Sequence, residues 1–85
     1  MNREQQIRYE LLLQLYSAKG LALSVANMHK TARYSDLDYK EAEIKFALIF
    51  LKGQKMCEEI TDPTTGVIRY AITSVGILEH EKGDS

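Results

Sequence analysis

The sequence predicts a mainly α-helical domain with a small β-hairpin: three helices around one core, a two-stranded hairpin and a short C-terminal helix. Apolar residues recur at helical spacing in three stretches before Gly53, and every second residue is apolar in one stretch after it. A cluster of turn-forming residues from Asp62 to Gly66 interrupts the second half. Since a chain of 85 residues builds one core, we expect a single domain over residues 1–85.

The first helix is predicted over residues 3–17, where Ile7, Leu11 and Leu15 recur every four residues with no Pro or Gly between them. Three consecutive leucines at positions 11–13 point in directions about 100° apart. The apolar arc of this helix is therefore wider than one small core can cover.

Two more helices are predicted before Gly53. Ser24 is a suitable N-cap for a short second helix that buries Met28. A third helix is predicted over residues 38–52, because Asp38 and Glu41 have the spacing of a capping box.

The third helix is apolar on nearly every side. Its apolar residues are Ile44, Phe46, Ala47, Leu48, Ile49, Phe50 and Leu51. If the side with Ile44 and Leu48 faces the core, then Phe46, Ile49 and Phe50 lie away from it. We therefore expect apolar surface beyond what one core buries.

The hairpin is predicted to pair strands at residues 55–60 and 67–73. Pro63 suits the second position of a type I turn, and Gly66 suits the left-handed conformation that lets the strands rejoin. Thr73 can cap a short last helix through Leu78, and residues 81–85 are expected to form a frayed tail. The centre of the core is predicted to hold Ile7, Leu11, Leu15, Val25, Met28, Leu48, Ile68, Tyr70 and Ile72.

Composition limits the possible functions. The net charge is −1, but residues 1–35 carry five basic and two acidic side chains, so cations gather in the first half. With Cys57 as the single cysteine, no internal disulfide and no four-ligand zinc site can form, and a reducing, cytoplasmic location is expected. No apolar run approaches 18 residues, so we expect no membrane span. No catalytic motif is present, and we expect neither an enzyme nor a bound metal or cofactor.

Two stretches resemble a known family. Residues 44–56 are similar to a recognition helix that runs into a Gly and the first wing strand, and residues 69–79 have a hydrophobic-Thr-x-x-Gly pattern typical of the exit from a wing. Together with the order of elements, they resemble the winged helix-turn-helix family of DNA-binding domains. The resemblance implies that the third helix lies in the major groove, the second crosses the backbone and the wing lies beside the duplex.

The resemblance also assigns candidate roles. It implies a DNA-binding transcriptional regulator or accessory factor with double-stranded DNA as partner. Tyr39, Lys40 and Glu43 would lead the third helix toward the bases. The wing tip, residues 64–66, carries no cation. The candidate contacts to phosphates are Lys30, Arg33, Tyr34 and Ser35 from the second helix and turn, Lys40 and Lys45 from the third helix, and Arg69 from the wing.

The alternative function is a winged helix used for protein interaction or self-association, without DNA binding. It follows from the excess apolar surface, the acidic second half and the bare wing tip. We expect a homodimer in which each copy presents the same patch. The candidate interface residues are Leu11, Leu12, Leu13, Phe46 and Phe50.

Overall fold

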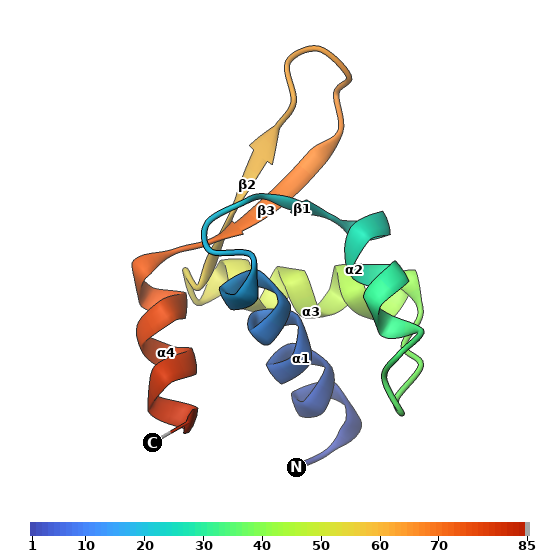
Figure 1. Ribbon diagram of the computed structural model, residues 1–85, viewed down its shortest axis with the longest axis vertical. Helices are drawn as coiled ribbons and strands as arrows, with labels where there is room; N and C mark the ends of the chain where they lie inside the picture. The colour runs from blue at the N-terminus through green and yellow to red at the C-terminus, as the bar shows by residue number, and fades with distance from the viewer. Residues whose placement is uncertain (85) are drawn as a thin grey trace.

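Four helices and a three-stranded antiparallel sheet make up residues 1–84, the part of the chain that this computed structural model describes (Figure 1). The β2–β3 hairpin projects away from the helices, as Figure 1 shows. The order is α1 (Arg3–Ser17), β1 (Leu23–Ser24), α2 (Val25–Ala32), α3 (Glu41–Gly53), β2 (Cys57–Thr61), β3 (Ile68–Ile72) and α4 (Ser74–Asp84).

Side-chain caps begin the first two helices. The Asn2 carboxamide accepts a hydrogen bond from the Gln5 backbone N–H at 2.8 Å, and the Gln5 side chain accepts one from the Asn2 N–H at 2.9 Å. Ser24 Oγ accepts from the Asn27 N–H at 3.1 Å, which confirms the predicted cap of α2. Each cap satisfies a donor that the first helical turn leaves without an internal partner.

The predicted start of α3 is wrong by three residues. Asp38 has a φ of +44°, a left-handed conformation that cannot belong to a right-handed helix. The helix begins at Glu41, and the Glu43 carboxylate accepts from the backbone N–H of Lys40 at 3.0 Å. The acidic residue that closes the first turn is therefore Glu43, and the expected Asp38–Glu41 capping box does not form.

The hairpin is part of a larger sheet than predicted. β3 lies between β1 and β2, with Leu23 opposite Tyr70 and Cys57 opposite Ile72. The strand β1 was not expected, because its two residues, 23 and 24, are too few to show an alternating pattern. Gly66 has its predicted left-handed conformation, with a φ of +75°.

One apolar core lies where the helices meet the base of the hairpin. Its members are Ile7, Leu11, Leu12, Leu15, Met28, Ala32, Tyr39, Ile44, Ala47, Leu48, Leu51, Cys57 and Ile72. Of the residues predicted at the centre, Val25 and Tyr70 are only half-buried. Ile68 is 45% exposed, so its predicted place in the core is wrong; it lies at the far end of β3, in the projecting hairpin.

The last helix is longer than predicted. Thr73 Oγ1 accepts from the Gly76 N–H at 3.2 Å, in keeping with its predicted capping role. α4 continues to Asp84, where residues 81–84 had been expected to fray, and Ser85 lies outside the described residues. Contacts with α1 accompany the added length: the His80 ring is buried against the Tyr16 ring, with 4.4 Å between their centroids, and the Tyr16 hydroxyl donates to the Glu81 carboxylate at 3.2 Å.

Candidate interaction surface

Tyr39 is not on the surface. Its side chain is 1% exposed, and its hydroxyl accepts a hydrogen bond from the Gln14 carboxamide at 2.9 Å. Burial raises the pKa of the Tyr39 phenol, so the group stays neutral. Tyr39 thus belongs to the core and offers nothing to a base edge.

Glu43 connects α1 to α3. Its carboxylate accepts from Arg3 Nε at 2.9 Å and from Arg3 Nη2 at 3.0 Å, in addition to the N–H of Lys40. The Arg3 hydrogen bond, supported by the Lys40 N–H, lowers the pKa of Glu43 to about 2. Of the three candidate base readers, only Lys40 keeps an exposed side chain, and its Nζ lies 3.5 Å from the Asp38 carboxylate.

The candidate phosphate contacts remain largely accessible. Lys30 and Arg33 are exposed at the end of α2, and Tyr34, in the turn that follows, is 90% exposed. Ser35 is half-buried, and its hydroxyl accepts from the Leu37 N–H at 3.1 Å.

Two further candidate cations lie nearer the sheet. Lys45 is exposed on α3. Arg69 on β3 is half-buried, and its Nη1 lies 3.5 Å from the Asn27 side-chain oxygen at the start of α2. With Lys40 at the N-cap of α3, the seven candidate phosphate contacts are spread over α2 and its turn, α3 and β3.

The candidate dimer residues separate into two groups. Leu11 and Leu12 are 0% and 7% exposed and belong to the core of the same chain. Leu13 is 39% exposed, and Phe46 and Phe50 on α3 are 61% and 43% exposed. Only the latter three present side chains to a partner.

A row of apolar residues runs along the exposed side of α3. Ala42, Phe46, Ile49 and Gly53 are all exposed and follow one another at intervals of four and three residues, which puts them on one side of the helix. Ile49 is 70% exposed, and Phe50 borders the row. We call these five residues the outer face of α3. Ile49 was not among the candidate site residues, although the all-round apolar pattern of the helix indicated it.

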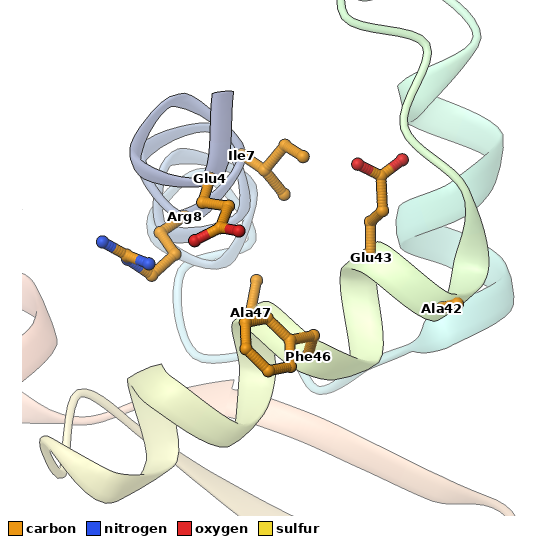
Figure 2. Close-up of a pocket in the computed structure, with 7 residues that line it drawn as sticks. All are labelled: Glu4, Ile7, Arg8, Ala42, Glu43, Phe46 and Ala47. Carbon is orange, nitrogen blue, oxygen red and sulfur yellow. The ribbon is translucent and has the colours of Figure 1, made fainter. Parts of the chain in front are cut away.

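A cavity of about 200 Å³ lies between α1 and α3, next to this face (Figure 2). Figure 2 shows Glu4 and Ile7 on α1 opposite Phe46 and Ala47 on α3, with Arg8 reaching to one side. The sequence did not indicate this cavity, because it depends on how two separate helices cross. It is lined by Glu4, Ile7, Arg8, Ala42, Glu43, Phe46 and Ala47.

The Arg8 side chain also contacts the outer face. Its guanidinium carbon lies 4.1 Å from the centroid of the Phe50 ring, a cation–π contact. Arg8 therefore lies between the cavity that it lines and the aromatic ring that it covers in part.

Cys57 and the acidic and histidine side chains are the groups to consider for nucleophilic or metal chemistry. Burial raises the pKa of the Cys57 thiol to about 11, so it stays protonated at neutral pH and is a poor nucleophile. No group of three or more His, Cys, Asp or Glu within residues 1–84 is placed to hold a metal ion. Within the same range, each helix is too short or too polar to cross a membrane.

Comparison with known proteins gives no match: no protein-family model, no curated protein and no solved structure is significantly similar to this chain.

Proposed function

We propose that this chain is a winged-helix-type protein-interaction module that binds its partner through the outer face of α3. The helix, helix, helix, hairpin, helix order supports the fold assignment, with β1 adding a third strand to the wing. The observation that carries the function is the apolar character of the α3 side that would face DNA in a winged helix-turn-helix protein.

Exposed aromatic and aliphatic side chains in a continuous row are typical of a protein interface. Fully burying a Phe or Ile side chain is favourable by about 1.5–3 kcal/mol, so Phe46, Ile49 and Phe50 together offer a sizeable part of a binding energy. That gain is available only from a partner that removes the three side chains from water.

Base readout has less support. Recognition in the major groove needs side chains that donate to or accept from base edges. Tyr39 is in the core and Glu43 is held by Arg3, while the middle of the outer face is Phe46 and Ile49. Thymine methyl groups are the one apolar feature of the groove that such a row could contact.

Site-specific photo-cross-linking in the cells that make the protein tests this proposal. A photoreactive phenylalanine analogue replaces Ile49 on the outer face, and a second variant carries it at Thr65 in the hairpin tip as a matched control. We expect cross-links from position 49 to a polypeptide and few from position 65. Cross-links from position 49 to nucleic acid would overturn the proposal.

Binding to the DNA backbone is the second candidate, in the role of a transcriptional regulator or accessory factor. Lys30, Arg33 and Lys45 favour it, because their side chains are exposed and make no ion pair with any described residue. With so few cations, this candidate predicts a log–log salt slope of roughly 2–4 per subunit for a random duplex.

Arg33→Ala provides the test of that candidate. It should lower the salt slope by about 1 on every sequence alike, because a phosphate contact does not read bases. Fluorescence anisotropy at two salt concentrations measures this slope. Absence of binding at low salt removes the candidate.

A further inference from the structure

We propose that the partner of the outer face is a second copy of this chain, and that Phe50 of each copy enters the cavity between α1 and α3 of the other. This inference rests on the proposed function, since it names the occupant of the same face. Three properties of the described residues carry it: the size of the cavity, the position of Phe50 relative to the cavity, and the charges around both.

The cavity accommodates an aromatic ring. The volume of about 200 Å³ exceeds the roughly 150 Å³ of an enclosed apolar cavity known to bind benzene. Unlike that cavity, the one here is open on one side and also lined by the charged Glu4, Arg8 and Glu43. Ile7, Ala42 and Ala47 line it with small or aliphatic groups, and Phe46 closes one side. A phenyl ring therefore finds both space and apolar contacts.

Phe50 lies in the right place for a two-fold arrangement. When two α3 helices pack antiparallel, so that Phe46 contacts Ile49 of the partner, position 50 comes opposite position 45 of the other helix. Positions 42, 43, 46 and 47 surround that point and line the cavity. The same pairing brings Ala42 opposite Gly53, and small residues at both ends let the helices approach closely.

Charges favour the same arrangement. Arg8 covers part of the Phe50 ring of its own chain. When this ring enters the cavity of the other copy, the Arg8 guanidinium comes close to the Glu4 carboxylate that lines that cavity. Each copy brings one Arg8 and one Glu4 to the contact, so that each incoming guanidinium has a carboxylate of the partner to approach.

The arrangement closes on itself. The Phe50 ring and the cavity lie on one surface of the chain. Two copies can therefore bury both rings and fill both cavities at once. The expected assembly is a dimer, without further growth into a filament.

Sedimentation equilibrium at tens of micromolar tests the dimer. We expect the parent to sediment at twice 9.7 kDa. Phe50→Ala removes the ring, and Ala42→Trp fills the cavity from an exposed position; each should raise the dissociation constant at least about tenfold. Ile60→Ala is the matched control, because Ile60 on β2 is also 43% exposed. Melting temperatures near that of the parent show that the variants fold.

A mixture of the two variants tests the ring-in-cavity contact itself. Either variant alone loses both contacts of the dimer, whereas a mixed dimer keeps one: Phe50 of the Ala42→Trp chain and the open cavity of the Phe50→Ala chain. Native mass spectrometry of an equimolar mixture should therefore show the mixed dimer above its statistical share.

Two results overturn the inference. One is a parent that stays at 9.7 kDa, and the other is a mixed dimer at or below its statistical share. Neither result decides the proposed function, which fails only if position 49 cross-links to nucleic acid. A cross-link from position 49 to a different polypeptide would leave the proposed function in place with another partner.

Discussion

At the scale of single residues, Glu43 contributes to stability in a pH-dependent way. Arg3 and the Lys40 N–H lower the pKa of its carboxyl from 4.5 to about 2. Because the pKa is lower in the folded chain, the stabilisation is present above pH 4.5 and is lost as the pH falls toward 2. Both side chains are partly exposed, so solvent screening keeps the effect modest.

Glu43→Gln should remove this pH dependence. We expect the parent to melt higher than the variant at neutral pH, and the difference to shrink between pH 4.5 and about 2. Thermal melts over that range measure it, with Glu58→Gln as the control for losing an exposed carboxylate on β2. A constant difference across the range would mean that the Arg3–Glu43 pair does not persist in solution.

Leu48 and Ile49 are neighbours on α3 with opposite environments. Leu48 is 2% exposed and Ile49 is 70% exposed. Leu48→Ala should cost about 2–5 kcal/mol of folding free energy, since it leaves a cavity in the core. Ile49→Ala should change it by less than about 0.5 kcal/mol at a protein concentration where the chain is monomeric. Urea denaturation measures both, and equal midpoints would show that α3 faces the core with a different side.

At the scale of elements, α4 is held against the start of β2 at Gly76. A Cβ on this residue would collide with the Met56 carbonyl oxygen and lie 2.8 Å from Ile72 Cγ1. The glycine of the hydrophobic-Thr-x-x-Gly pattern is therefore required by the close approach of a helix to a backbone carbonyl.

Gly76→Ala should destabilise the fold by about 1–3 kcal/mol, because the backbone carbonyl of Met56 cannot move aside easily. Gly83→Ala is the matched control in the same helix, where a Cβ meets nothing within 4 Å, and it should leave stability unchanged or raise it slightly. Chemical denaturation compares the two. Similar midpoints for both variants would contradict the docking of α4 seen here.

The helices and the hairpin could be predicted because their signals are local. The cap at Ser24 and the turn glycine at position 66 act through their own neighbours in sequence, and both were predicted correctly. The start of α3 and the length of α4 depend on distant contacts, such as Arg3 with Glu43 and Tyr16 with Glu81. A single sequence contains no information on which distant side chains will meet.

The candidate site was predictable to a similar extent. The excess of apolar residues on α3 indicated exposed Phe46 and Phe50, because seven apolar positions in eight exceed what one side of a helix holds. The burial of Leu11 was predicted, but that of Leu12 was not, because it is the packing of α1 between α3 and α4 that covers the wide apolar arc of α1. The burial of Tyr39 was not predicted either, since it depends on contacts with distant residues such as Gln14.

At the scale of the whole molecule, the outer face of α3 is the surface that a second copy of the chain is expected to cover. Methyl NMR of the isoleucine side chains follows this face directly, with Ile49 as the reporter and Ile60 on the hairpin as an internal reference. As protein concentration rises, we predict that the Ile49 methyl signal shifts and becomes shielded from a soluble paramagnetic agent. The Ile60 methyl signal should stay unchanged. A random duplex at low salt should shift neither methyl signal. An Ile49 signal that ignores protein concentration and shifts on addition of the duplex would contradict the account.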